Sequence, residues 1–138
     1  MKIGGKTVKN AVKKDEIVIK NFKQLKVWER AVNFAVSLYG IARKFPKFEE
    51  YNLKSQLLRA ATSVSANLAE GNGTIFPKKE LSFYDNAKCS LDEVRGWLEI
   101  AKRLGYIDEQ KFAELDNEAI EISKIIIGLM RKILKEST

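Results

Sequence analysis

The third quarter of the chain carries apolar residues in an unbroken heptad pattern, and this pattern restricts the fold strongly. Spacings of three and four residues place side chains on one face of an α-helix, whereas a half-buried β-strand needs alternation at every second residue. The residues that share this face are Tyr84, Ala87, Leu91, Val94, Leu98 and Ala101. Pro77 suits the first turn of such a helix, and Gly105 marks its end. The pattern predicts a long amphipathic helix that packs on other helices.

Three further segments repeat the same spacing. One runs from Asn21 to Phe45-Pro46, another from Asn52 to the glycine signal at residues 71–73, and the last follows a plausible cap at Asp108. Their predicted core residues are Leu25, Trp28, Val32, Ala35, Tyr39 and Ala42, then Leu57, Ala60, Ala61, Val64 and Leu68, then Phe112, Leu115, Ala119, Ile122, Ile126, Leu129 and Ile133. Four helices with short connections predict an all-α fold, an antiparallel up-down-up-down four-helix bundle over residues 21–138.

Residues 1–20 differ from the bundle in charge and in residue spacing. They carry six lysines against two acidic residues, show no helical period, and include a short run at residues 16–20 that could be extended. We interpret them as a basic N-terminal arm. A flexible arm that orders on binding and a frayed chain end are both compatible with this composition, and the second is the more common.

The chain lacks the residues that most catalytic and metal sites use. It has 138 residues, the size of one domain, with no histidine and one cysteine. The usual general base and the Glu-x-x-His ligands of di-iron bundles are therefore missing, and one thiol cannot build a thiolate zinc site. Gly71-x-Gly73 is too short for a phosphate-binding loop, and helix capping explains it. The sequence predicts a protein that is not an enzyme and that binds no metal or other cofactor.

Targeting signals are also missing from the sequence. No apolar run approaches the roughly 20 residues that cross a bilayer, and no apolar segment follows the N-terminal lysines as it would in a secretory signal. We therefore expect a cytoplasmic protein with no membrane partner.

The net charge is +7, with an isoelectric point near 9.5. The excess is uneven, because residues 1–20 contribute +4 and residues 21–50 contribute +3, whereas residues 107–138 contribute −2. A basic excess attracts polyanions through counterion release, but plain solubility explains it equally well. RNA or DNA is thus a candidate partner that charge alone does not establish.

Helical spacing sorts the basic residues into short stripes. The candidate nucleic-acid-binding residues are Lys23, Lys26, Arg30, Lys88, Arg95, Lys102 and Arg131. The first three lie at the start of the first helix, the next three repeat every seven residues along the third, and the last lies on the fourth. Asp85, Asp92 and Glu99 run beside the middle stripe and dilute it. Each basic residue therefore also fits an ordinary solvated helix face.

The fourth helix is more apolar than one core requires. Besides its main stripe it carries Ile120, Ile125, Ile127, Met130 and Leu134. A soluble monomer seldom exposes a large contiguous apolar patch, so this width favours self-association. Burial of the helix on two sides within one chain is the competing interpretation.

The second helix combines small residues with a polar set. Alanine and serine at residues 60–69 permit close approach of a neighbouring helix, and the predicted structural polar core comprises Arg59, Ser63, Asn67 and Glu70. A buried Asn fixes the register of packed helices at some cost in stability. Glu70 is unfavourable near a helix C-terminus, so we expect Arg59, Lys88 or backbone N–H groups to hold it. A ligand-binding role for Asn67 and Glu70 is the less favoured alternative.

Three motifs lie on the first three predicted helices. They read Phe22-Lys23-Gln24-Leu25-x-Val27-Trp28-x-x-Ala31, then Gln56-x-x-Arg59-Ala60-Ala61-x-Ser63-Val64-x-x-Asn67-x-Ala69-Glu70-Gly71, then Tyr84-x-x-Ala87-x-x-Ser90-Leu91-x-Glu93. Together they resemble the four-helix-bundle proteins encoded in bacterial 23S ribosomal-RNA intervening sequences, a superfamily that includes the accessory variability determinants of diversity-generating retroelements. The resemblance covers roughly residues 21–135, and residues 1–20 lie outside it.

This resemblance implies a homopentameric ring of four-helix bundles around a central channel, with a basic surface. In the retroelement branch, members bind nucleic acid and the element's reverse transcriptase, whereas the role of the ribosomal branch is largely unestablished. The sequence leaves both branches open, so a reverse transcriptase is a partner only on the first.

Two functional hypotheses follow. The first is a non-enzymatic, homo-oligomeric RNA- or DNA-binding accessory protein, and the second is a protein-binding scaffold that docks an acidic partner without contacting nucleic acid. Salt-dependent binding separates them, because phosphate contacts release counterions.

Overall fold

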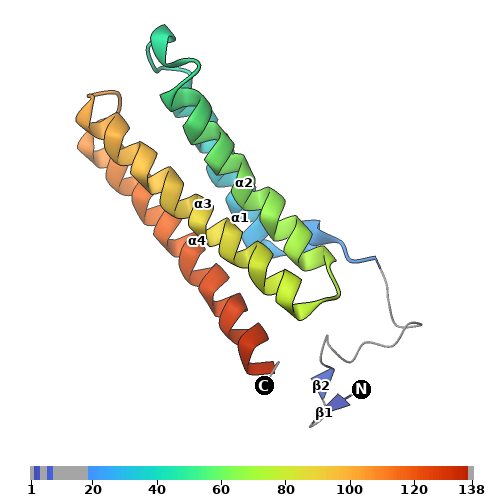
Figure 1. Cartoon of the computed structure of the whole chain (residues 1–138). Helices are drawn as coiled ribbons and strands as arrows, with labels where there is room; N and C mark the ends of the chain where they lie inside the picture. The colour runs from blue at the N-terminus through green and yellow to red at the C-terminus, as the bar shows by residue number, and fades with distance from the viewer. Residues whose placement is uncertain (1, 4–5, 8–18, 137–138) are drawn as a thin grey trace.

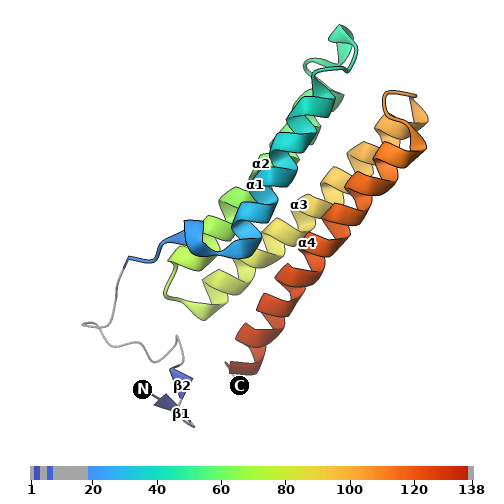
Figure 2. The same cartoon turned by 180° about the vertical axis from the view of Figure 1, so that it is seen from behind.

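The computed structural model describes residues 2–3, 6–7 and 19–136. Within them lie four long helices, which are α1 (Lys26–Ala42), α2 (Leu53–Gly73), α3 (Pro77–Arg103) and α4 (Glu109–Glu136). Two single-turn 3-10 helices, η3 (Phe22–Gln24) and η4 (Lys47–Glu49), precede α1 and α2. Successive helices run in opposite directions, as Figures 1 and 2 show. The predicted four-helix, all-α fold is confirmed at this level.

The helix ends follow the predicted signals. Pro77 is the first residue of α3, and Gly105, with a φ of 81°, reverses the chain after it. The Asp108 carboxylate accepts a hydrogen bond from the backbone N–H of Lys111 at 2.7 Å, which caps α4. Asn52 occupies the N-cap position of α2 without making a side-chain cap bond.

At the N-terminus, two short strands pair in antiparallel fashion, β1 (Lys2–Ile3) with β2 (Lys6–Thr7). Most of the predicted basic arm, including residues 16–18 of the expected extended run, lies outside the described residues.

The predicted core residues of α2 and α3 are all buried. In α4 the buried residues are Leu115, Ala119, Ile122 and Ile126, and the predicted Phe112, Leu129 and Ile133 are half-buried. The heptad pattern was therefore a reliable guide wherever one helix presents a single apolar stripe to two neighbours.

The predicted core face of α1 was right at Ala35 and Ala42, and Leu25 and Trp28 are partly buried against the core. It was wrong at Val32 and Tyr39. Its buried residues are Val27, Ala31, Phe34, Ala35, Leu38 and Ala42, whereas Val32 is half-buried and Tyr39 is exposed. Both stripes satisfy the spacing of three and four, because α1 is apolar over a wide arc. Phe34 and Leu38 bury more surface than Val32, and they turn the helix toward the core.

The contact between α2 and α3 is close. A Cβ atom added at Gly71 would lie 2.5 Å from Cε1 and 2.7 Å from Cδ1 of the buried Tyr84 ring. Glycine at this position therefore serves the approach of the two helices, and its φ is not positive. Contact between α1 and α4 is sparse by comparison.

Candidate nucleic-acid interface

A small polar cluster joins α2 to α3. The Asn67 side-chain amide donates to the Ser63 carbonyl oxygen at 2.8 Å and to the Ser63 hydroxyl at 3.0 Å. The Ser90 hydroxyl donates to the same Ser63 oxygen across the helix pair at 3.0 Å. The cluster is partly buried, and the hydrogen bond from Ser90 to Ser63 crosses the α2–α3 contact, so the cluster helps to hold those two helices in register.

Arg59 and Glu70 lie outside this cluster. Both side chains are exposed, so they do not belong to a polar core. Glu70 makes no ion pair with Arg59, and Lys88 pairs with Asp92 instead. The expectation that one of these cations holds Glu70 was wrong, because an exposed carboxylate is stabilised by water and needs no protein partner.

The three basic residues of the α3 stripe are paired with acids. Lys88 lies 2.7 Å from Asp92 one turn along the same helix. Arg95 reaches Asp116 on α4, with its Nε 2.7 Å from Oδ1. The ammonium of Lys102 lies 3.2 Å from Glu99 and 4.2 Å from the centroid of the Phe112 ring. Much of the positive field of this stripe is therefore neutralised locally.

Arg30 is paired as well, and its partner lies across the bundle. Its guanidinium donates two hydrogen bonds of 2.8 Å to the Glu118 carboxylate on α4. This two-pronged geometry is the favourable one for arginine and carboxylate. Arg30 thus ties α1 to α4 along a contact that has little other packing.

The ion pairs raise the pKa of two cations of the α3 stripe and lower the pKa of one acid beside it. The hydrogen bond to Asp116 raises the pKa of Arg95, and the hydrogen bond to Asp92 raises the pKa of Lys88. The hydrogen bonds from Arg103 and Lys102 lower the pKa of Glu99. All of these groups stay fully charged at neutral pH, so the neutralisation along α3 does not depend on pH in that range.

The three remaining predicted residues, Lys23, Lys26 and Arg131, are exposed and make no ion pair within the part of the chain that the structure describes. Lys23 is in η3, Lys26 begins α1, and Arg131 is in the last turns of α4. In Figures 1 and 2 the start of α1, the turn from α2 to α3 and the end of α4 lie toward the same end of the bundle.

Three further exposed cations lie toward this end, and sequence reasoning missed them. Lys78 and Lys79 are in the first turn of α3, and Lys132 follows Arg131. None is paired with a described carboxylate, although Lys79 lies 5.3 Å from the centroid of the Phe76 ring. Their adjacency in pairs breaks the heptad spacing, so a search for stripes passes over them. We call the set Lys23, Lys26, Lys78, Lys79, Arg131 and Lys132 the basic end.

Comparison with known proteins agrees with the motifs on α1, α2 and α3. A family model described as 23S rRNA-intervening sequence protein matches residues 23–128. The chain belongs to this family. A solved structure of a protein of unknown function from the S23 ribosomal protein family of Bacteroides thetaiotaomicron VPI-5482 superposes with a TM-score of 0.70 at 25% identity, covering 75% of this chain and 97% of that one.

No curated protein matches the chain. The matched family and the solved structure both have ribosomal names, and neither name mentions a retroelement or a reverse transcriptase.

The outward side of α4 in this family member carries apolar residues. Ile125 and Leu134 are exposed, at 38% and 51% of their surface, and Ile120, Ile127 and Met130 are half-buried. Two-sided burial within one chain therefore does not account for the width of the apolar face.

The described residues contain no group of three or more Asp, Glu, Cys or His side chains that could hold a metal ion. None of the helices over residues 19–136 has the length and apolar character to span a membrane.

Proposed function

We propose that the protein is a non-enzymatic RNA-binding accessory protein that acts as a homo-oligomer. The observation that carries the proposal is the basic end, where six exposed cations have no carboxylate partner among the described residues. An unpaired cation is free to displace the counterions of a phosphate, whereas a paired one must first give up its carboxylate. The family description supplies RNA as the polyanion.

Oligomerisation strengthens this proposal. Glu29 and Glu70 also lie toward the basic end, so the excess of positive charge there is modest in one chain. A symmetric assembly repeats the same end several times around one axis and adds its fields. The exposed apolar residues of α4 supply a surface for the contact between subunits.

RNA binding is tested by measuring the affinity of the full chain for fluorescent RNA over roughly 50 to 200 mM salt. We expect the logarithm of the association constant to fall linearly with the logarithm of the salt concentration. Absence of binding at low salt, or an affinity indifferent to salt, would remove the nucleic-acid proposal.

The oligomer is tested by multi-angle light scattering. We expect a mass that is a multiple of 15.7 kDa, and five copies is the number that the family resemblance implies. A mass of one chain would contradict the assembly. Replacing Ile125 and Leu134 by Gln should lower the mass without changing the helical circular dichroism of the chain.

A protein-binding scaffold is the second candidate, and the exposed apolar side chains of Ile125 and Leu134 on α4 favour it, because they offer a surface for a protein partner. The ion pairs of Arg30, Lys88, Arg95 and Lys102 neutralise more than half of the predicted basic residues, which weakens the case for phosphate contacts by those residues. An oligomer that binds an acidic protein but no RNA at low salt would replace our proposal by this one.

A further inference from the structure

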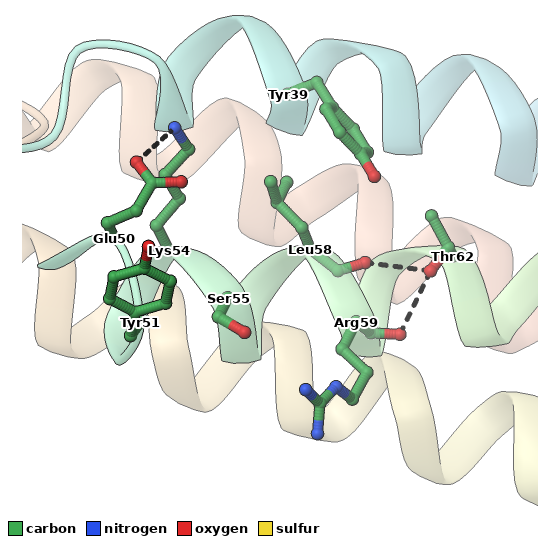
Figure 3. A pocket seen from close by; sticks show the side chains of 8 residues that line it. All are labelled: Tyr39, Glu50, Tyr51, Lys54, Ser55, Leu58, Arg59 and Thr62. Carbon is green, nitrogen blue, oxygen red and sulfur yellow. Dashed lines mark hydrogen bonds and ion pairs between the residues drawn. The ribbon is translucent and has the colours of Figure 1, made fainter.

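An open groove lies on the outer side of α1 and α2, toward the end of the bundle opposite the basic end. Its volume is about 350 Å³, and it is lined by Tyr39, Glu50, Tyr51, Lys54, Ser55, Leu58, Arg59 and Thr62. Figure 3 shows Tyr39 reaching from α1 over Leu58, Tyr51 beside Glu50 and Lys54, and Arg59 extending from the far side of α2. The groove thus combines two phenol rings, a guanidinium and short hydroxyl side chains.

The aromatic rings of the groove are open to solvent. Tyr51 is 93% exposed and Tyr39 is 41% exposed, and neither makes an aromatic contact within the described residues. Burial of such rings in the core would have contributed to folding, so their exposure has no stabilising role in the isolated chain. A planar ligand could stack on either ring.

The charge around the groove is positive once the ion pairs are accounted for. Glu50 is paired with Lys54 at 3.0 Å, and Glu49 is buried and accepts a hydrogen bond of 2.8 Å from the Tyr106 hydroxyl. The Tyr106 hydroxyl is neutral and leaves the charge of Glu49 in place, but Glu49 is buried and does not line the groove. Arg59, which lines the groove, is exposed and has no carboxylate partner among the described residues.

We propose that this groove binds an unpaired stretch of single-stranded RNA, with a base stacked on Tyr51 and a backbone phosphate on Arg59. Aromatic rings interleaved with cations are the standard means of holding single strands, because every base has a face to stack on and every nucleotide has a phosphate. A duplex is excluded, since its bases are stacked inside the helix and cannot reach a tyrosine ring. The inference rests on the proposed RNA-binding function and adds the form of RNA and a second contact surface.

The test compares a fluorescein-labelled oligouridylate with a duplex RNA of the same length, each bound by the full chain at fixed low salt. Tyr51→Ala should weaken binding of the single strand roughly tenfold and leave binding of the duplex unchanged. Tyr51→Phe should bind like the natural chain, because it keeps the ring. Leu104→Ala removes another exposed apolar side chain at the same end of the bundle and should change neither affinity.

A salt titration separates the role of Arg59. Arg59→Gln should reduce the slope of log affinity against log salt for the single strand by about 0.7, the contribution of one phosphate contact. Photocrosslinking of a 4-thiouridine strand should label the peptide that contains Tyr51.

Equal affinity of Tyr51→Ala and the natural chain for the single strand would overturn the inference, as would equal loss for single strand and duplex. Those results leave the proposed function intact, provided that the natural chain binds RNA. If the natural chain binds neither RNA, the proposed function and the groove inference fail together. Since Tyr51 is nearly fully exposed, its replacement leaves the fold unchanged, and thermal melting checks this.

Discussion

At the contact between α2 and α3, one extra methyl group at Gly71 would collide with Tyr84, whereas at the basic end Lys23 and Arg131 extend into solvent without a described partner. The two regions obey different rules. The α2–α3 contact depends on close packing, because an added side chain at Gly71 would overlap the Tyr84 ring. The basic end is determined by charge, and its side chains need only be exposed. Substitutions in the first region should change stability, and substitutions in the second should change binding.

The largest expected effect is at Gly71. Gly71→Ala should lower the free energy of unfolding by about 1–3 kcal/mol, because the new Cβ overlaps a buried ring that has little space to move. Gly96→Ala is the matched control, since nothing lies within 4 Å of its Cβ position in the middle of α3. We expect the control to gain up to about 1 kcal/mol from helix propensity. Equal denaturant midpoints for the two variants would show that the close contact is not required.

The polar cluster should come next. Ser63→Ala removes the hydroxyl that accepts hydrogen bonds from Asn67 and Ser90, and it leaves two partly buried donors with one bond fewer. We expect a loss of about 1–2 kcal/mol in urea unfolding. Ser37→Ala provides the comparison, because Ser37 is exposed and bonds only to the Asn33 carbonyl of its own helix. A loss no larger than that of the control would mean that the cluster does not stabilise the α2–α3 contact.

Alkaline pH should weaken the same contact. Burial and the nearby Glu80 carboxylate raise the pKa of Tyr84 above its ordinary value of 10. A proton held more tightly in the folded state stabilises the fold fully below pH 10, and this contribution is lost as pH rises above 10. The natural chain should therefore lose more melting temperature between pH 9 and 11, roughly, than Tyr84→Phe does. Parallel melting curves for the two proteins across this range would contradict the assignment.

On the charged surface, changes in stability should be small. Arg95→Gln breaks the bond to Asp116, where both side chains are partly exposed, and we expect a loss of about 0.2–1 kcal/mol. RNA affinity should be unchanged, because the charge of Arg95 is already neutralised. If Arg95→Gln kept its stability but lost RNA binding, Arg95 would belong to the RNA interface. RNA contacts would then extend beyond the basic end, contrary to our proposal.

The sequence predicted the fold better than the site, and the residues show why. On α3 a single stripe met the core, so Leu91, Val94 and Leu98 could be assigned from spacing alone. On α1 two stripes competed, and only the size of Phe34 and Leu38, weighed against their neighbours, selects the right one.

The pairing of the cations was harder to predict. Arg30–Glu118 and Arg95–Asp116 join different helices, so they depend on how those helices are aligned, which spacing within one helix does not encode. Lys78, Lys79 and Lys132 were missed because they fall outside any heptad stripe and come together from two helices, at the start of α3 and the end of α4. The groove at Tyr51 likewise forms from α1, α2 and residues 50–51 just before α2, and it has no periodic signature.

The central claim is that cations of the basic end, and not those paired along the bundle, contact RNA. The direct test measures the salt dependence of RNA affinity for two triple variants to Gln. One variant replaces Lys23, Lys26 and Arg131, and the other replaces Lys88, Arg95 and Lys102. We expect the first to bind more weakly and to reduce the slope against log salt by about 2, and the second to keep the natural slope. A full slope in the first variant and a reduced slope in the second would contradict the account.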